Sequence, residues 1–231
     1  MIEWLFPPRC PVCFEPVLPK GAQIHPACSA KLLFIGEPIC KKCGKPLEDE
    51  SEEYCAECMV SERGWEMGRS VFPYQSIIRR AIRVVKNEGT MEFVRFFGTQ
   101  LYLHQKKYLY RITADCIVPI PMHPTKFRRR GFNQAELLAE ELGRHMGIPV
   151  KCLLKKVKKT KDQKHLTKVQ RRKNVRDVYQ PDQTLLREGV PQTVLLVDDI
   201  VTTGSTLTAC AEALKLAGVR KVYFLTVCAG E

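Results

Sequence analysis

The segment 193–219, TVLLVDDIVTTGSTLTACAEALKLAGV, contains the pattern that decides the fold of this 231-residue chain. Its apolar run at 194–197 is typical of a buried strand, and the run ends in two adjacent carboxylates, Asp198 and Asp199. A loop of hydroxyl residues around Gly204 follows, and the apolar spacing after that loop predicts a helix. The segment therefore predicts a strand–loop–helix unit whose polar groups gather in the loop.

The loop has the chemistry of an anion site. Backbone N–H groups at the start of a helix have no helical acceptor, and together with the helix dipole they favour an anion. Gly204 lets a backbone approach such an anion closely, and the neighbouring hydroxyls add donors. The predicted phosphate-binding residues are Thr202, Thr203, Gly204, Ser205 and Thr206. The alternative is an ordinary turn that is capped by Thr and Ser.

The two carboxylates extend this site. Ionised Asp198 and Asp199 only accept hydrogen bonds, which suits the vicinal hydroxyls of a sugar. Together with the loop they predict a ribose 5-phosphate that is held at both ends. The G-x-x-x-x-G-K-[ST] pattern of P-loops does not occur, so an ATPase with that loop is not expected.

Strands and helices alternate through the rest of the chain after residue 68. Helices are predicted at 76–89, 92–105, 133–147 and 205–218, and strands at 116–122, 193–199 and 221–228. Such alternation predicts an α/β fold, a parallel sheet flanked by helices. Ligands bind beyond the carboxyl ends of the strands in these sheets, and the loops 198–206 and 119–134 both lie at that address.

Cysteines are concentrated in the first quarter of the chain. Seven of the eleven lie there, mostly in C-x-x-C pairs, a spacing that lets one tight turn direct two ligands to the same ion. The predicted metal ligands are Cys10, Cys13, His25, Cys28, Cys40, Cys43, Cys55 and Cys58. They predict a double zinc-ribbon domain over 1–62, with two structural Zn²⁺ ions, that is unfolded without its metal.

The grouping of these ligands stays open. One possibility is Cys10/Cys13/His25/Cys28 with Cys40/Cys43/Cys55/Cys58, since 11 residues separate the pairs in each set. The gap 29–39, between the pairs His25/Cys28 and Cys40/Cys43, is also 11 residues long. The spacing therefore does not distinguish this grouping from an interleaved one. His25 is the less secure ligand, because a three-cysteine site could take its fourth donor elsewhere. The four isolated cysteines are interpreted as small buried residues: Cys116, Cys152, Cys210 and Cys228.

The net charge of +12 is unevenly distributed. The segment 151–176 contains nine Lys and three Arg against one Asp, whereas 1–60 contains six Lys and Arg against nine Asp and Glu. A polyanion is therefore expected to contact the middle of the chain; the alternative is a solvated charge run. No apolar run is long enough to span a membrane and no signal peptide is recognisable, so a cytoplasmic location is expected.

The segment VLLVDDIVTTGST resembles the phosphoribosyl-pyrophosphate binding motif of type I phosphoribosyltransferases. More narrowly, the chain resembles the competence protein F (ComF) family through VPIPMHPTKFRRRGFNQAELLA, LFPPRCPVC and TKDQKHLTKVQRRKNV. The resemblance implies a type I phosphoribosyltransferase-like domain over 68–231, preceded by the small zinc-ribbon domain. It also implies a flexible loop at about 151–178.

The same resemblance implies roles for individual residues. Asp198 and Asp199 would contact the ribose hydroxyls, and 202–206 would bind the 5-phosphate. The implied pyrophosphate loop contains Arg129, Arg130 and Gly131, with Mg²⁺ bridging phosphoribosyl pyrophosphate and its ribose hydroxyls. The flexible loop carries the recurring positions Thr160, Gln163, Arg171 and Asn174.

The family implies a competence factor that is required for natural transformation and handles internalised single-stranded DNA in the cytosol. A competence helicase or other DNA-processing protein is the implied partner. The alternatives are an active phosphoribosyltransferase of nucleotide salvage and a nucleotide-sensing regulator. No hood element that would select a base is recognisable, so whether the site catalyses ribosyl transfer, and to which acceptor, stays open.

Overall fold

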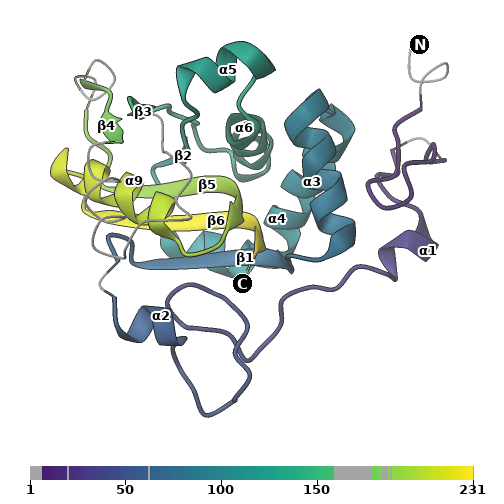
Figure 1. The fold of residues 1–231 in the computed structure, drawn as a ribbon, viewed down its shortest axis with the longest axis horizontal. Helices are drawn as coiled ribbons and strands as arrows, with labels where there is room; N and C mark the ends of the chain where they lie inside the picture. The colour runs from purple at the N-terminus through teal and green to yellow at the C-terminus, as the bar shows by residue number, and fades with distance from the viewer. Residues whose placement is uncertain are drawn as a thin grey trace.

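A four-stranded parallel sheet forms the centre of the computed structural model, which describes residues 7–19, 21–61, 63–158, 178–183, 187 and 189–230. The strand order is β1 (Met67–Pro73), β6 (Lys221–Ala229), β5 (Thr193–Val201) and β2 (Cys116–Pro119), as Figure 1 shows. The apolar runs of β5 and β6 are buried on both faces, which is why they contain almost no alternation. The predicted parallel sheet with flanking helices is confirmed.

Each face of the sheet has its own core. Leu195 and Val197 point to the side covered by α3 (Ser76–Glu88), α4 (Met91–Ile112) and α6 (Gln134–Met146). Val194 and Leu196 point to the opposite side, which α9 (Ser205–Leu216) covers. Because neighbouring side chains of a strand alternate between faces, one apolar strand supplies both cores.

The helix boundaries follow local signals. Gly89 and Gly147 adopt the left-handed conformation that ends α3 and α6. The Asn133 side chain caps α6 by accepting a hydrogen bond from the backbone N–H of Ala135. The predicted helices at 76–89, 92–105, 133–147 and 205–218 are confirmed, apart from boundary shifts such as that of α4, which continues to Ile112.

Two segments differ from the sequence-based expectation. Residues 119–134 were expected to form a loop, but they contain the short helix α5 (Pro124–Arg130). His123 caps this helix through its ring Nδ1, and Gly131 ends it with φ of 85°. Strand β5 also continues past the two carboxylates to Val201, because its pairing with β6 extends to Ala229.

A second, antiparallel pair of strands packs beside α9. It consists of β3 (Leu154–Lys156) and β4 (Tyr179–Pro181). The predicted flexible-loop residues Thr160, Gln163, Arg171 and Asn174 lie outside the described residues. Cys116, Cys210 and Cys228 are buried as predicted, whereas the prediction for Cys152 is wrong. Cys152 is exposed because it precedes β3 at the surface, with its Sγ 3.5 Å from a Glu136 carboxylate oxygen.

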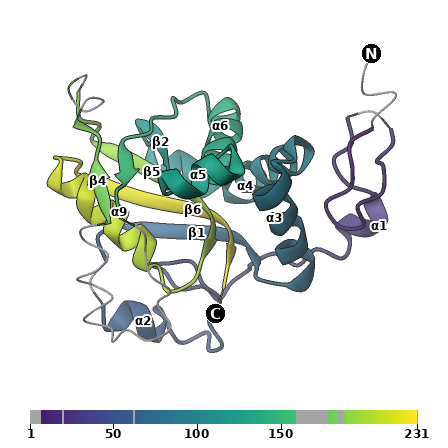
Figure 2. The ribbon, with the colours of Figure 1, turned by 45° about the horizontal axis from the view of Figure 1, so that its top comes forward.

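The two cysteine-rich parts lie at different sides of the sheet. The short helix α1 (Pro26–Ser29) marks the first beside α3 and α4, and α2 (Ala56–Met59) marks the second below β1, as Figures 1 and 2 agree. The domain division at 1–62 and 68–231 stays a prediction, but Cys40 and Cys43 share the α9-side core with Trp65. Among the described residues, no helix is both long enough and apolar enough to cross a membrane.

Candidate functional site

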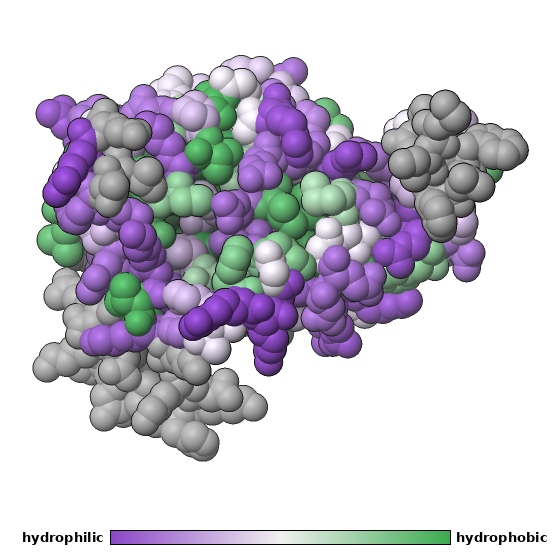
Figure 3. Space-filling model, turned by 90° about the horizontal axis from the view of Figure 1, so that it is seen from above, coloured by the Kyte–Doolittle hydropathy of each residue, from purple (hydrophilic) through white to green (hydrophobic). Residues whose placement is uncertain are grey.

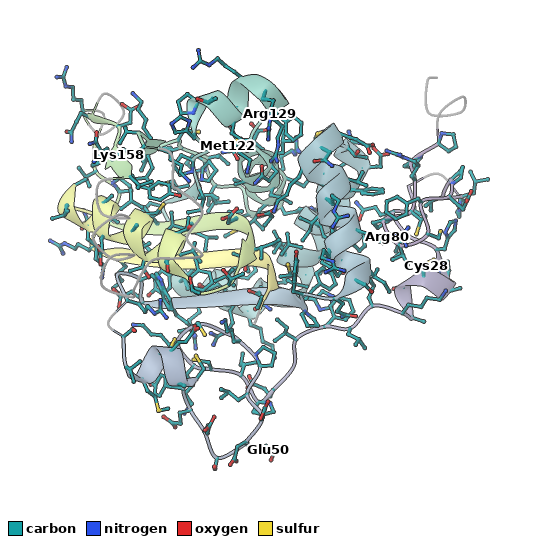
Figure 4. The ribbon with its side chains drawn as sticks, viewed as in Figure 1. Cys28, Glu50, Arg80, Met122, Arg129 and Lys158 are labelled. Atoms are coloured by element: carbon teal, nitrogen blue, oxygen red, sulfur yellow. The ribbon has the colours of Figure 1, made fainter. Side chains whose placement is uncertain are left out.

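A cavity of about 570 Å³ lies at the carboxyl ends of β2 and β5. Asp198 and Asp199 enter it from β5, Thr206 from α9, and Arg129 from α5. Figure 3, which views the molecule from above Figure 1, on the side of α5 and α6, shows a surface that is largely hydrophilic with scattered hydrophobic residues. Figure 4 shows Arg129 and Met122 together on the α5 side of the sheet, well away from Cys28 and Glu50 in the two cysteine-rich parts.

The two carboxylates occupy different environments in this cavity. Asp199 is buried and its Oδ2 lies 2.6 Å from Nζ of Lys86. Asp198 Oδ1 accepts a hydrogen bond of 2.8 Å from the backbone N–H of Asp199. Burial, followed by the charge of Asp199, raises the pKa of Asp198 well above its usual value. A cation or a hydroxyl donor that enters the cavity would therefore stabilise the ionised form of the two carboxylates.

The hydroxyl loop has the geometry of a helix N-terminus, and among its first N–H groups that of Ser205 donates to Thr203 Oγ1 over 3.4 Å. Gly204 precedes α9 with φ of 70°, a conformation that glycine adopts without strain. The first helical hydrogen bond, of 2.8 Å, runs from Thr208 N to Gly204 O, so the earlier N–H groups have no helical acceptor. The hydroxyls of Thr203 and Ser205 lie 2.8 Å apart and bond to each other.

The predicted phosphate and pyrophosphate residues are only partly brought together. Within the described part of the chain, the cavity lining includes Thr206 but not Thr202, Thr203, Gly204 or Ser205, which form the adjacent turn. Arg129 lines the cavity, Arg130 instead bonds the Gln134 side chain, and Gly131 ends α5. The binding roles of all these residues stay predictions.

Sequence reasoning gave no individual role to several cavity residues: Lys86, His123, Lys126, Lys156 and Tyr179. His123 and Lys126 lie in the segment 119–134 that was expected at the ligand site, and Lys156 lies in the basic segment, whereas Lys86 and Tyr179 come from α3 and β4. Lys86 lies in the last turn of α3, and this position puts it beside the strand ends. Burial lowers the pKa of Lys156. The added lysines make the cavity suitable for an anion larger than a single phosphate.

The first cysteine cluster contains Cys10, Cys13, His25 and Cys28, whose ligand atoms all lie within 4.8 Å of one another. Cys13 Sγ lies 3.4 Å from Nδ1 of His25, while His25 Nε2 lies 2.9 Å from the carbonyl oxygen of Pro16. A carbonyl only accepts, so Nε2 donates and the lone pair of Nδ1 faces the thiols. Three sulfurs and one imidazole nitrogen at this spacing fit tetrahedral zinc.

The second cluster contains Cys40, Cys43, Cys55 and Cys58, again within 4.8 Å. Cys43 Sγ and Cys55 Sγ lie 3.7 Å apart, close to the separation of about 3.8 Å that Zn–S bonds of 2.3 Å impose in a tetrahedron. Burial would raise the pKa of the Cys40 thiol, but backbone hydrogen bonds lower it to about 7, which favours the thiolate. The clusters have the non-interleaved grouping.

Two family models match this chain. A double zinc ribbon domain matches residues 1–59, and a phosphoribosyl transferase domain matches residues 104–231. Competence protein F of Haemophilus influenzae is 30% identical over 199 residues, which cover 80% of this chain and 82% of the relative.

Two further relatives match over similar lengths. Competence protein ComFC of Bacillus subtilis is 28% identical over 86% of this chain and 80% of its own length. DNA utilization protein YhgH of Salmonella typhimurium is 27% identical over 96% of this chain and 97% of its own length. The chain therefore belongs to the competence protein F family, and it carries a double zinc ribbon domain ahead of a phosphoribosyl transferase domain.

Proposed function

We propose that this chain binds phosphoribosyl pyrophosphate, or a closely related ribose phosphate, in the cavity at the ends of β2 and β5. The observation that carries the proposal is the pairing of two carboxylates, Asp198 and Asp199, with cations from α3 and α5 in one cavity. A ligand that has both hydroxyls and phosphates complements the two kinds of group. The volume of about 570 Å³ is typical of small-molecule sites.

The proposed orientation follows from the charges. The ribose hydroxyls donate to Asp198 and Asp199, and the 5-phosphate accepts from the loop 202–206 at the start of α9. The diphosphate lies towards Lys126 and Arg129 on α5. Mg²⁺ belongs to this proposal, since carboxylate and phosphate oxygens are the ligands it prefers, and it would neutralise diphosphate charge.

The remaining parts of the chain support the ligand site. Each cysteine cluster binds one structural Zn²⁺, as its donor atoms allow. The basic segment 151–176 supplies cations to the diphosphate or to a nucleic-acid backbone, and Thr160, Gln163, Arg171 and Asn174 are its proposed contact residues.

The cellular role that we propose is in natural transformation, where the protein handles internalised single-stranded DNA in the cytosol. Relatives named competence protein F, ComFC and DNA utilization protein support this role, as does the concentration of positive charge in one segment. A competence helicase or another DNA-processing protein is the proposed partner. Charge reversal at Lys158, Lys159, Arg171 and Arg172 should abolish salt-dependent single-strand binding, whereas unchanged affinity would remove this part of the proposal.

The ligand proposal is tested by calorimetric titration of phosphoribosyl pyrophosphate with Mg²⁺ into the full-length protein. The double variant Asp198→Asn/Asp199→Asn should lose binding. Asp115→Asn is the matched control, because Asp115 lies at the opposite end of β5 and accepts hydrogen bonds from Gln192 N and Thr193 N. Equal affinity in the wild type and the double variant would contradict the proposal. Transformation frequency in cells with the same variants connects the site to competence.

The match to a phosphoribosyl transferase domain over 104–231 favours a second candidate, ribosyl transfer to an acceptor. This candidate predicts release of pyrophosphate when the protein, the sugar diphosphate and candidate bases or DNA are mixed. Binding without release would identify the pocket as a sensor of the ligand.

A further inference from the structure

The side chain of Arg63 connects the second cysteine cluster to the hydroxyl loop. One guanidinium nitrogen, Nη1, donates to the carbonyl oxygen of Thr203 over 2.8 Å. The other, Nη2, lies 3.8 Å from a carboxylate oxygen of Glu57, which lies in α2 between two cysteines of the cluster. The Arg63 side chain is only 11% exposed, whereas that of Glu57 is 45% exposed and also lies 3.3 Å from Lys45 Nζ, so solvent partly screens the ion pair.

Trp65 completes the contact between the two regions. Its ring is fully buried, and it packs edge-on against Phe224 of β6 at 4.8 Å. The Arg63 guanidinium lies over the indole at 5.8 Å, and a Cβ on Gly204 would lie 3.8 Å from the same ring. The Arg63 guanidinium therefore lies between the buried ring of Trp65 and the hydroxyl loop.

The hydrogen bond to Thr203 determines where the loop directs its donors. In a trans peptide unit the C=O and the following N–H point in opposite directions. The Thr203 carbonyl points towards Arg63, so the N–H of Gly204 points away from Arg63. Rotation of this peptide would reverse the two dipoles and present a carbonyl oxygen where an anion needs a donor.

We propose that Arg63 is a positioning residue through which metal binding at the second cluster holds the hydroxyl loop in its anion-binding conformation. The part of this inference that concerns ligand affinity rests on the proposed function. The first cluster does not share this role. Its polar and aromatic contacts are with α3 and α4, through Arg9, Phe14 and Gln23.

The positioning role is tested by amide hydrogen exchange over 201–208 in the full chain. Arg63→Met should accelerate exchange there at least about ten-fold, because it removes a hydrogen bond from a charged donor. Arg63→Lys should restore part of the protection, since it keeps a charged donor. The emission of Trp65, measured in a Trp4→Phe background, should shift to the red in Arg63→Met.

Arg69→Met is the matched control for this test. Arg69 is also partly buried beside the second cluster, where its Nη1 donates to the carbonyl oxygens of Gly68 and Lys41. It does not bond the loop within the described structure, so its variant should leave exchange over 201–208 unchanged. Equal exchange in the Arg63 and Arg69 variants would overturn the positioning role.

Coupling to the metal is tested with Cys58→Ser. This variant should accelerate exchange of the loop in the wild-type background and have little further effect in Arg63→Met. Additive effects would overturn the coupling. If Cys58→Ser does not fold, stepwise zinc chelation of the folded wild type and of Arg63→Met gives the same comparison.

Ligand titration separates this inference from the proposed function. Arg63→Met should bind phosphoribosyl pyrophosphate about ten-fold more weakly than the wild type. If the wild type itself binds none, the proposed function is wrong, while the exchange data still decide whether Arg63 positions the loop. If the wild type and Arg63→Met bind equally, the inference is wrong and the proposed function stands.

Discussion

The first C-x-x-C pair of each cluster, Cys10/Cys13 in the first ribbon and Cys40/Cys43 in the second, forms the same backbone turn, which we call the knuckle. The two knuckles contact the rest of the protein in different ways. In both, the residue after the second cysteine donates its N–H to the carbonyl of the first cysteine, over 2.9 Å for Phe14 and 2.8 Å for Gly44. Both residues have positive φ, 69° and 72°. The same turn therefore carries a large aromatic side chain in one ribbon and no side chain in the other.

The difference follows from what each turn contacts. The Phe14 ring lies 5.5 Å from Phe93 and beneath the Arg80 guanidinium at 4.8 Å, so the first ribbon attaches through side chains. A Cβ on Gly44 would lie 2.8 Å from the carbonyl oxygen of Gly68, so the second ribbon attaches through close backbone approach. The same turn is therefore docked on the surface of α3 and α4 in the first ribbon, and it is part of the α9-side core in the second.

Metal removal should show this difference most strongly. Cys43→Ser should lower the stability of the whole chain by about 3–5 kcal/mol, or roughly 10 °C in Tm, because Cys43 lies in the α9-side core. Cys13→Ser, its counterpart in the first ribbon, should unfold that ribbon locally and leave the main transition almost unchanged. Calorimetric melts of both variants provide the measurement, and equal shifts would contradict the comparison.

Gly44→Ala tests the backbone contact alone. The added Cβ would meet a backbone oxygen at 2.8 Å in a left-handed conformation, so we expect a loss of about 2–4 kcal/mol. Gly21→Ala is the matched control in the first ribbon. Its φ is also positive, but nothing lies within 4 Å of the new Cβ, so a loss of about 1 kcal/mol is expected. Urea unfolding would measure both, and similar losses would show that the close approach is unimportant.

Phe14→Ala tests the side-chain contact. It removes the aromatic pair with Phe93 and the cation–π contact with Arg80, which together should weaken ribbon docking by about 1–3 kcal/mol. Limited proteolysis should then cleave the first ribbon or the linker at 29–36 faster, with no change in the unfolding of the sheet. An unchanged cleavage rate would assign the docking to other contacts.

Arg9→Met should have the smallest effect. Arg9 bridges the first ribbon to α3 and α4 through Glu88 and Glu92, at 3.4 and 3.3 Å, but its side chain is 41% exposed. Ion pairs at such positions contribute about 0.2–1 kcal/mol and weaken with salt. The same proteolysis assay at low and high salt measures this loss. An effect as large as that of Phe14→Ala would contradict the expectation that the ion pairs contribute less to docking than the aromatic contact.

Local patterns predicted many elements because they depend on a few consecutive residues. The caps at Asn133, Gly89 and Gly147 and the knuckle spacing all act within one turn of backbone. Helix α5 was missed because its polar, arginine-rich composition lacks an apolar face. Its start depends instead on the ring of His123 and on Pro at the first helical position.

The sequence by itself determined the alternation of strands and helices, the adjacent carboxylates that follow the apolar run of β5 and the spacing of the metal ligands. Only the tertiary structure decided which cysteines group together, that Lys86 of α3 pairs with Asp199, and that Arg63 bonds a carbonyl 140 residues away. The physical reason is range. Backbone conformation responds to neighbours within a turn or two, whereas pockets and docking surfaces form where packing brings distant segments together.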